Sequence, residues 1–297
     1  MSEQTAQEFE EQRTHLLGLA YRMLGEMAAA EDVVQEAWLK WNASRPSDIR
    51  EPRAWLSTVT IRLALDALKS AQSRRETYVG PWLPEPILPD DVRAFAADVP
   101  STRAELASDL SLALLFVLER LSPEERAAFI LHEAFDCDYG VIAATLDKSE
   151  AACRKLVSRA REHVRQERPK RSVNSDEHKD LLARFTKAAL VRDQAELARL
   201  FAPDVVFYSD GGGRAPAALN PILGSDKVQR LILGLMGKFQ SETAPIAKFV
   251  EINGRTGLLT IVDGVLFSAL DIEADDGRIT AIYLLRNPDK LARAFGV

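Results

Sequence analysis

Cysteine is scarce in this sequence of 297 residues, which has only Cys137 and Cys153. Two cysteines form no disulfide framework and no four-cysteine zinc site. No apolar run approaches the roughly 20 residues that span a bilayer, and Met1 to Glu11 is acidic and polar, unlike a signal peptide. The sequence therefore predicts a cytoplasmic protein that has no membrane partner, binds no metal and needs no cofactor.

An excess of basic residues is also lacking. The chain has 38 Lys plus Arg against 44 Asp plus Glu, a formal net charge of −6, whereas a protein that binds nucleic acid on its own usually carries a basic surface. The basic residues gather locally, at Arg74–Arg75 and between Arg154 and Arg171. The charge balance thus excludes an autonomous basic DNA binder but not a subunit that reads DNA within a larger assembly.

The composition, with 46% hydrophobic and 28% charged residues, is that of a folded protein, and 297 residues predict more than one domain. From Phe9 to about Gln72 apolar residues recur with helical spacing. This pattern predicts helices over His15–Leu24, Ala28–Trp41 and Pro52–Ser73, with a polar loop over Asn42–Glu51.

The segment from Tyr78 to Thr102 differs in composition, because it contains five prolines together with Trp82, Leu83 and Ile87. Prolines at this spacing exclude a long helix. A flexible linker would be rich in Gly and Ser and would lack aromatic residues. The residues alone leave two interpretations open: a stiff spacer, or an extended segment that docks against another part of the protein.

Helical spacing resumes after the proline-rich segment. Leu106–Leu121 is predicted as one helix, and Ser122-Pro123-Glu124-Glu125 opens the next one with an N-cap serine, a proline at the first position and early acids. Two short helices follow, Tyr139–Leu146 and Glu150–Arg168, with Ser149 as the predicted N-cap of the second.

Two short helices joined by a three- or four-residue turn form a helix-turn-helix, whose second helix enters the major groove of DNA. The second helix has a polar, basic side and an apolar side, which includes Cys153 as a predicted buried small hydrophobe. Basic residues on such a face contact phosphates, and those near the helix start reach base edges. The same residues also fit an ordinary solvated basic helix in a bundle.

After the polar linker Pro169–Ser175 the pattern changes again. Glu177–Phe201 predicts two helices, and runs with period-2 alternation follow. Asn253-Gly254, Asp263-Gly264 and Asp276-Gly277 fall between runs and signal tight turns between antiparallel strands. Helices followed by an antiparallel sheet predict an α+β domain. The predicted strands are Val205–Ser209, Ile246–Ile252, Gly257–Val262, Val265–Ile272 and Ile279–Leu285.

Two blocks of the helical part resemble a known family. AEDVVQEAWLKW (residues 30–41) and EPRAWLSTVTIRLALDALKSAQSRR (residues 51–75) resemble the second conserved region of bacterial extracytoplasmic-function (ECF) sigma factors. LSPEERAAFILHEAFDCDYGVIAATLDKSEAACRKLVSRAREHVR (residues 121–165) resembles their fourth region. Two independent blocks in the expected order make the resemblance specific. It implies a sigma factor that directs core RNA polymerase to promoters in transcription initiation.

The resemblance also implies contacts for individual residues. In the family, the acidic helix of region 2 docks on the clamp helices of the polymerase β′ subunit, and the β flap is a further polymerase partner. Trp55 can stack on an unpaired base, although its apolar neighbours favour a core position. The implied polymerase-binding residues are Asp32, Gln35 and Glu36; those at the minus-10 element are Asn42, Arg53, Ser57, Thr58 and Arg62; those at the minus-35 element are Glu150, Ala151, Arg154, Lys155, Ser158 and Arg159.

Three further motifs, WLPEP, DGGGR and NPDKL, resemble signatures of the ECF group with a fused C-terminal SnoaL-like domain, a cone-shaped fold of the nuclear-transport-factor type. Three consecutive glycines expose backbone N–H groups and permit another segment to approach closely, although a loose loop has the same composition. We expect the three motifs to lie together as an interdomain regulatory site. Its residues are Trp82, Leu83, Pro84, Glu85, Pro86, Asp210, Gly211, Gly212, Gly213, Arg214, Asn287, Pro288, Asp289, Lys290 and Leu291.

The expected fold is therefore multidomain, with two all-α sigma domains, the second with a helix-turn-helix, and an α+β SnoaL-like cone-shaped domain. The predicted boundaries are 1–75 for sigma region 2, 76–104 for the proline-rich linker, 105–171 for sigma region 4 and 176–297 for the SnoaL-like domain. The last domain is expected to control the sigma regions in cis, by a population shift between a docked chain and one spread over polymerase. No separate anti-sigma factor is then required, and the free protein is expected to be a monomer.

SnoaL-like domains include cyclases and isomerases, so two alternatives stay open: a fusion whose last domain is an active enzyme, or one whose last domain is a ligand-binding sensor. Enzyme chemistry of this kind needs a general acid or base inside the cone. The candidates His178, Tyr208, Asp210, Glu251 and Asp271 have no evident partner in the sequence, and the acids are expected at the surface. The sequence therefore predicts no catalytic residue and a protein that is not an enzyme.

Overall fold

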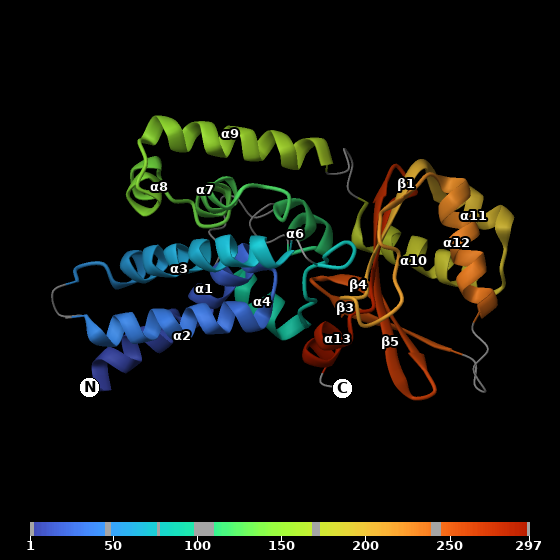
Figure 1. The fold of residues 1–297 in the computed structure, drawn as a ribbon, viewed down its shortest axis with the longest axis horizontal. Helices are drawn as coiled ribbons and strands as arrows, with labels where there is room; N and C mark the ends of the chain where they lie inside the picture. Colours follow the sequence, from blue (N-terminus) through green and yellow to red (C-terminus); the bar gives the residue numbers. More distant parts are fainter. Residues whose placement is uncertain are drawn as a thin grey trace. The chain divides into compact units, whose positions relative to one another are not determined.

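A computed structural model describes residues 3–44, 49–75, 78–97, 110–167, 173–238 and 245–295. These residues form two compact units (Figure 1). The N-terminal unit contains the described residues up to 75, 90–97, 110 and 114–167, and the C-terminal unit contains residues 78–89, 111–113 and those from 173 onward. Among the described residues, every helix is too short or too polar to span a bilayer.

Three long helices, α1 (Glu3–Leu24), α2 (Met27–Ala43) and α3 (Pro52–Arg75), begin the N-terminal unit and pack against one another. Helix α1 ends at the predicted stop, where Gly25 has a left-handed φ of +68°. It starts well before the predicted His15, because Phe9 is buried on the same helix and packs on the ring of Trp38 at 5.0 Å.

The proline-rich segment contains a helix that the sequence did not predict. Residues 78–88 are not helical, but α4 (Pro89–Ala97) follows them. Pro89 stands at the first helical position and Asp90 and Asp91 in the first turn, which are favourable residues for a helix start. Phe95 is buried with its ring 6.0 Å from that of Tyr21. Packing on α1 therefore stabilises a short helix next to prolines that exclude only a long one.

The described chain from Leu110 to Glu167 is again mainly helical. The predicted helix Leu106–Leu121 is shorter than expected: residues 106–109 lie outside the described ranges, and Leu110 and Ser111 are not helical. The next helix begins as predicted, because the Ser122 hydroxyl accepts a hydrogen bond from the Glu125 N–H at 3.3 Å and the Glu125 carboxylate accepts one from the Ser122 N–H at 3.2 Å. These helices are α6 (Leu112–Leu118), α7 (Pro123–Glu133), α8 (Tyr139–Leu146) and α9 (Glu150–Glu167).

Helices α8 and α9 form the predicted helix-turn-helix. Asp147 in the turn is left-handed with a φ of +54°, and the Ser149 hydroxyl accepts from the Ala152 N–H at 3.2 Å and caps α9. Cys153 is buried, and burial raises the pKa of its thiol, as expected for a packing residue rather than a reactive one. The buried side of α9, which packs on α7 and α8, consists of Cys153, Leu156, Val157, Ala160 and Val164.

The C-terminal unit has the predicted α+β class, with two helices before the first strand and a helix before the last four strands. Its elements are α10 (Ser175–Leu190), α11 (Gln194–Leu200), β1 (Phe201–Asp210), β2 (Ile222–Leu223), α12 (Ser225–Lys238), β3 (Ile246–Ile252), β4 (Arg255–Val262), β5 (Val265–Asp275), β6 (Arg278–Leu285) and α13 (Pro288–Phe295). This is the order that the SnoaL-like resemblance implies, with the two-residue strand β2 added.

The predicted hairpin turns are confirmed. Asn253, Asp263 and Asp276 each have a φ of +51°, and the glycines after them have φ values of +80°, +79° and +71°. Two successive left-handed residues make the type I′ turn, whose twist matches that of the flanking strands. The three turns connect β3 to β4, β4 to β5 and β5 to β6.

The expectation of a purely antiparallel sheet is wrong at one pairing. The strand order is β2-β1-β6-β5-β4-β3, and β1 runs parallel to β6. After β1 the chain passes through α12 to the far edge of the sheet and returns by three hairpins, so that β6 arrives beside β1 in the same direction. Hairpin signals report neighbours in sequence only, and they cannot show which strand pairs with β1.

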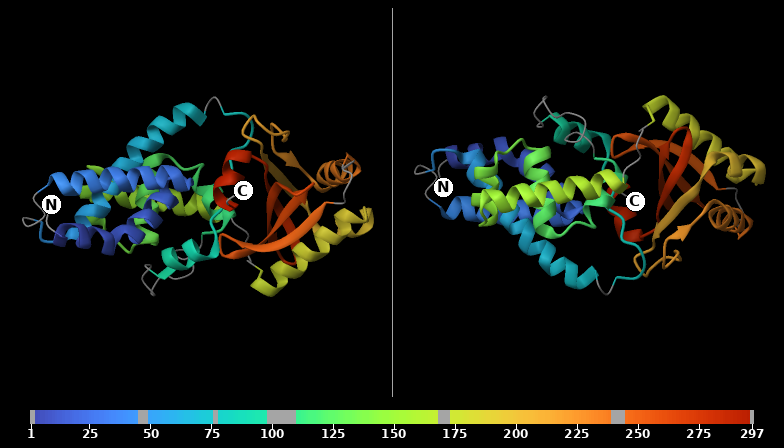
Figure 2. Two further views of the ribbon diagram at one scale, coloured as in Figure 1. Left: turned by 90° about the horizontal axis from the view of Figure 1, so that it is seen from below. Right: turned by 90° about the horizontal axis from the view of Figure 1, so that it is seen from above.

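Helices α10 and α12 pack on one face of this sheet, and α13 lies on the side of the other face (Figure 2). The core between the sheet and the two helices includes Phe185, Phe201 and Phe207. Phe207 alternates along β1 with Tyr208, which lies on the opposite face and stacks on Tyr283 of β6 at 5.6 Å. The two faces of the sheet therefore have separate surroundings, and the next section treats them separately.

Candidate functional site

The three predicted polymerase-binding residues share one exposed face of α2. Asp32, Gln35 and Glu36 are all exposed, while Val33, Val34 and Ala37 on the other side are buried. Leu39, one turn further along the same face, is 57% exposed. Leucine on an amphipathic helix is usually part of the core, so the exposure of Leu39 is unusual for this residue type. The acidic residues and Leu39 therefore form one exposed stripe along α2.

Two of the predicted minus-10 residues surround a buried histidine. Arg53 donates to His15 Nδ1 at 3.0 Å, and Ser57 Oγ lies 2.8 Å from His15 Nε2. The Ser57 hydroxyl also donates to the Arg53 carbonyl at 2.8 Å. His15 thereby fixes the orientation of both side chains on the first turns of α3. The sequence offered no signal for this role, because a single histidine in an apolar helix is usually a core residue.

Two other predicted minus-10 residues contact the helix-turn-helix. Arg62 donates to the carbonyls of Thr145 at 3.0 Å and Ala144 at 2.7 Å, at the C-terminal end of α8. Thr58 Oγ1 lies 3.4 Å from Thr145 Oγ1. Asn42 is exposed at the end of α2. The structure therefore divides the predicted minus-10 set: Arg62 and Thr58 are engaged by α8, and Asn42 is not brought together with them.

The sequence left two roles open for Trp55, stacking on an unpaired base or a position in the core, and in the structure its environment is intermediate between the two. Its side chain is partly buried, and its ring centroid lies 5.5 Å from that of the fully buried Trp41. Trp41 donates from its indole N–H to the Thr5 carbonyl at 3.0 Å. Trp55 therefore covers a core tryptophan with one face and keeps part of its surface in solvent.

The predicted minus-35 residues all lie on the exposed side of α9. Ala151, Lys155 and Ser158 lie opposite the buried stripe, and Arg154 and Arg159 lie at its two flanks. Arg154 is oriented by Glu150 at 2.7 Å and by the ring of Tyr139, which its guanidinium covers at 5.0 Å. The exposed face is therefore suited to the major groove, with a pre-oriented arginine near the helix start.

Arg159 has a different environment from Arg154. Its Nε lies 3.1 Å from Glu125 of α7, although its side chain is 64% exposed. Arg161, one turn beyond Ser158, likewise pairs with the buried Glu133 at 2.6 Å. These pairs join α9 to α7, so the flank basic residues hold the helix-turn-helix together.

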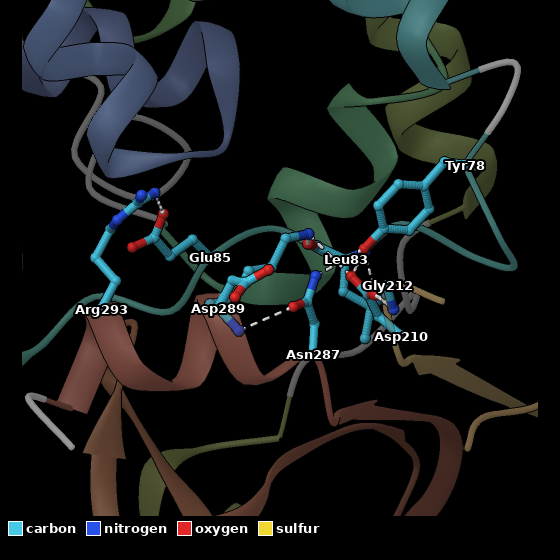
Figure 3. Close-up of polar contacts among 9 residues, drawn as sticks. Tyr78, Leu83, Glu85, Asp210, Gly212, Asn287, Asp289 and Arg293 are labelled. Carbon is cyan, nitrogen blue, oxygen red and sulfur yellow. Dashed lines mark hydrogen bonds and ion pairs between the residues drawn. The ribbon is translucent and has the colours of Figure 1, made fainter. Parts of the chain in front are cut away.

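In the C-terminal unit the three predicted regulatory motifs lie together around the carboxylate of Asp210 (Figure 3). Asp210 ends β1 and is completely buried. It accepts hydrogen bonds from the Tyr78 hydroxyl at 2.6 Å, the Leu83 N–H at 3.0 Å and the Gly212 N–H at 2.9 Å. One carboxylate thus joins the proline-rich segment to the glycine loop. We call residues 78–88 the linker and this cluster the clasp.

Lys290 of α13 completes the clasp with a second buried charge. Its Nζ lies 2.9 Å from Asp210 Oδ2, donates to the Leu83 carbonyl and stands 4.0 Å from the centre of the Trp82 ring. The side chains of Lys290 and Asp210 are 6% and 0% exposed. A buried ion pair of this kind is maintained only with additional hydrogen bonds, which the linker backbone supplies.

The glycine loop is shaped to let Asn287 approach. Gly212 has a φ of +59°, and a Cβ at this position would overlap the side-chain amide of Asn287. Asn287 Nδ2 donates to the Tyr78 hydroxyl at 3.0 Å, and its Oδ1 accepts from the Asp289 N–H at 3.0 Å, which caps α13. Of the two interpretations of the glycines, close approach is therefore the one that the structure shows.

The remaining motif residues are placed around the clasp. Glu85 is buried and lies 3.6 Å from Arg293, while Arg214 pairs with Asp289 at the surface. The sequence missed Tyr78, which belongs to the clasp, and Asn253, which holds the linker at a different point. Asn253 exchanges two hydrogen bonds with the backbone of Ile87 at the other end of the linker. Of the other motif residues, Pro84, Pro86 and Leu291 are buried and Pro288 is exposed.

Two expectations about catalytic candidates need correction. Asp271 and Asp210 are buried, not at the surface, and both have partners. Asp271 lies 3.5 Å from Nε2 of the buried His178, which also contacts the Thr256 carbonyl at 3.0 Å. Glu251 is exposed as expected. Within the described residues no three His, Cys, Asp or Glu side chains are grouped as metal ligands.

The helix-turn-helix with its exposed α9 and the three-helix bundle with its acidic stripe define a DNA-reading subunit of the transcription machinery. Residues 9–74 match the family description "Sigma-70 region 2", and residues 111–164 match "Sigma-70, region 4". The chain belongs to the ECF RNA polymerase sigma factors. Members of this family bind core RNA polymerase and promoter DNA, and this chain functions as an RNA polymerase sigma factor.

Similarity to relatives extends through the C-terminal unit. The chain is 42% identical over 291 residues to "ECF RNA polymerase sigma factor SigJ" of Mycobacterium tuberculosis, covering 95% of this chain and 92% of the relative. It is 33% identical over 282 residues to "Probable ECF RNA polymerase sigma factor SigI" of the same species, covering 94% and 92%. The crystal structure of the M. tuberculosis SigJ protein superposes with a TM-score of 0.75 at 38% identity, covering 97% of this chain and 98% of that one.

Proposed function

We propose that the C-terminal unit controls this sigma factor in cis by holding the linker. The clasp carries the proposal: the buried Asp210 and Lys290 both bind the backbone of Leu83, between the end of α3 and the start of α4. The linker connects the promoter-melting helices to the helix-turn-helix. A domain that holds it restricts how the two sigma regions separate.

The length of the linker sets the scale of this restriction. An extended chain covers about 3.3 Å per residue, so the 11 residues 78–88, when free, reach across roughly 36 Å. Held against the C-terminal unit, the same residues contribute little reach. The proposed control is a shift between a state with the linker bound in the clasp and a state with the linker free and the sigma regions spread over polymerase.

Within the sigma regions we infer roles for the exposed surfaces. Asp32, Gln35 and Glu36 bind core polymerase, with Leu39 added as an apolar contact on the same face. The exposed side of α9 reads the minus-35 element. In this structure the side chains of Arg62 and Thr58 contact residues of α8. They can therefore contact the minus-10 element only after these contacts with α8 are broken.

Transcription in vitro with core polymerase tests the cis control. The double variant Asp210→Asn/Lys290→Met removes both buried charges together and leaves no uncompensated ion, so the fold is retained while the linker loses its charged partners. We expect promoter-specific transcription to change by about tenfold relative to the unmodified chain. The matched control Asp204→Asn removes an exposed carboxylate of β1 outside the three motifs and leaves transcription unchanged. Unchanged activity in the folded double variant contradicts the proposal.

Promoter reading by α9 is tested separately with Arg154→Ala. Loss of an arginine that contacts a base edge weakens binding by about 1–3 kcal/mol and relaxes specificity at that position. Binding of the polymerase complex to a selected promoter and to random DNA is compared. An equal loss on both DNAs assigns Arg154 to phosphate contact instead.

A further inference from the structure

The C-terminal unit encloses a cavity of about 690 Å³ between the sheet and helices α10 and α12. This volume falls in the range of small-molecule sites, roughly 300–1,000 Å³. The clasp residues Asp210 and Lys290 are not part of its wall. The contacts between the clasp and the linker therefore do not account for the presence of this cavity.

The wall is apolar on nearly every side. Helices contribute Phe185 from α10 and Leu231, Leu235 and Met236 from α12, and the strands contribute further aliphatic and aromatic side chains. Phe267 of β5 lies on the wall beside Arg286, which follows β6. Such a wall is suited to an apolar body and offers few hydrogen-bonding groups.

Arg286 is the only lysine or arginine among the described residues that line this cavity. Its Nη1 donates to the Pro216 carbonyl at 2.7 Å, and its guanidinium lies 3.8 Å from the centre of the Phe267 ring. The Nε atom is buried and has no hydrogen-bond partner. Burial lowers the pKa of Arg286 below the ordinary arginine value. Arg286 is partly buried, and a guanidinium that has lost part of its hydration is stabilised when an anion binds it.

The other charged group on the wall lies at a different place. Asp263 is in the turn between β4 and β5, beyond their last pair, Val262 and Val265. Arg286 follows Leu285, which pairs with Ala269 further along β5. The register of β5 therefore places Asp263 and Arg286 at different points along the strand. Asp263 is not the ion-pair partner of Arg286, whose guanidinium can bind an anionic ligand. The hydroxyl of the buried Ser268 also lines the cavity near this end.

We propose that this cavity binds an amphipathic organic acid, with its apolar body against α10 and α12 and its carboxylate on Arg286. A carboxylate matches the geometry of a guanidinium and accepts two charge-assisted hydrogen bonds, which a neutral alcohol or ketone cannot do. This ligand site is separate from the proposed cis control. Because ligand binding is measured without polymerase, the ligand proposal and the cis-control proposal can each fail without the other.

Calorimetric titration of the full-length protein with dodecanoate and with dodecanol tests the proposal. The two probes share one alkyl chain and differ in the charged group. We expect one dodecanoate per chain and binding at least about tenfold tighter than that of dodecanol. Arg286→Gln is expected to weaken dodecanoate binding about tenfold and to leave dodecanol binding unchanged. The control Arg278→Gln, at the exposed first residue of β6, leaves both unchanged.

A second variant locates the site independently of Arg286. Leu235→Trp adds volume to the cavity wall on α12, at a side chain that is only partly buried. We expect this variant to bind neither probe. Its melting temperature should stay near that of the unmodified chain. Dodecanoate binding that survives Leu235→Trp overturns the proposal, because the site then lies elsewhere. Equal affinity for dodecanol and dodecanoate, or many molecules bound per chain, also overturns it.

Discussion

Two buried cations hold different parts of this chain, and they differ in their partners. Arg126, in the N-terminal unit, donates to the Met23 carbonyl at the end of α1 and pairs with Glu119 next to its own helix. Lys290, in the C-terminal unit, binds Asp210 and the linker backbone. Burial lowers the pKa of Arg126 to about 9, so the group stays charged at neutral pH. Each cation is paired with a buried carboxylate, Arg126 with Glu119 and Lys290 with Asp210. Only in the clasp do both members of the ion pair also bind the backbone of the linker.

The comparison shows which contact opens first. Between the two sigma regions, Arg126 and Arg62 end on main-chain carbonyls at the ends of α1 and α8. The bond from Arg62 to Ala144 is exposed, so water can replace the protein partner there, whereas the bonds of Leu83 to Asp210 and Lys290 are buried. We therefore expect the contact of Arg62 with α8 to open locally before the linker leaves the clasp.

The largest expected effect comes from breaking the clasp on one side. Asp210→Ala leaves Lys290 buried without its counter-charge, and loss of one partner of a buried pair costs about 3–5 kcal/mol. Chemical denaturation of the C-terminal unit should show this loss. Asp289→Ala, whose partner Arg214 is exposed, should cost less than about 1 kcal/mol. Equal effects of the two variants would show that the buried pair is not the main support.

A smaller effect is expected when the glycine loop is changed. Gly212→Ala places a Cβ at a φ of +59° and against Asn287, which should cost about 1–3 kcal/mol of stability. The linker should also become easier to cleave by a protease. Gly234→Ala is the matched control, because Gly234 lies in α12 with open space around it and the change there should stabilise the helix by about 0.5–1 kcal/mol.

The contact between the sigma regions should respond more weakly. Arg62→Ala removes one partly buried and one exposed hydrogen bond to α8, and we expect about 1 kcal/mol of local destabilisation. Amide hydrogen exchange in α8 should then be roughly fivefold faster, without loss of global stability. Lys69→Ala, exposed on the same helix, is the control. Unchanged exchange in α8 would mean that other contacts alone hold the two regions together.

The smallest expected effect is a pH dependence confined to the C-terminal unit. Burial lowers the pKa of His178, but its bonds to Asp271 and the Thr256 carbonyl raise it by more, so the net pKa lies above the ordinary value. The resulting stability is complete below the ordinary histidine pKa and is lost as the pH rises through the raised pKa. We expect this change in the free energy of unfolding to be smaller than the effects of Asp210→Ala and Arg62→Ala. Asp271→Asn should abolish this slope, and a slope that persists would assign it to another group.

Local signals in the sequence predicted much of the fold. The N-caps at Ser122 and Ser149, the turn at Asp147 and the Asn-Gly and Asp-Gly hairpins each depend on neighbouring residues, and the structure confirms them. Helix α4 was missed because its stability comes from Phe95 packing on α1, a contact that no local pattern contains. The parallel pairing of β1 with β6 was missed for the same reason.

The site residues divide in the same way. The exposed stripe Asp32, Gln35 and Glu36 follows from helical periodicity alone. The pairing of His178 with Asp271 and the support of Arg53 by His15 join residues far apart in the chain, and neither was predicted. The three motifs of the clasp were predicted to meet because a family resemblance supplied the long-range information that single residues lack. Tyr78, which lies outside those motifs, was missed.

Ser209 and Asp210 are neighbours in β1, and their side chains leave the strand on opposite faces. Ser209 lines the cavity and accepts a hydrogen bond from the Ala218 N–H, while Asp210 holds the linker. One short stretch of backbone thus borders both a ligand site and the clasp. Thermodynamic reciprocity then applies: whatever factor an acid in the cavity contributes to linker retention, linker retention contributes to the affinity for that acid. Core polymerase, by drawing the linker away, would change the acid's affinity by the same factor.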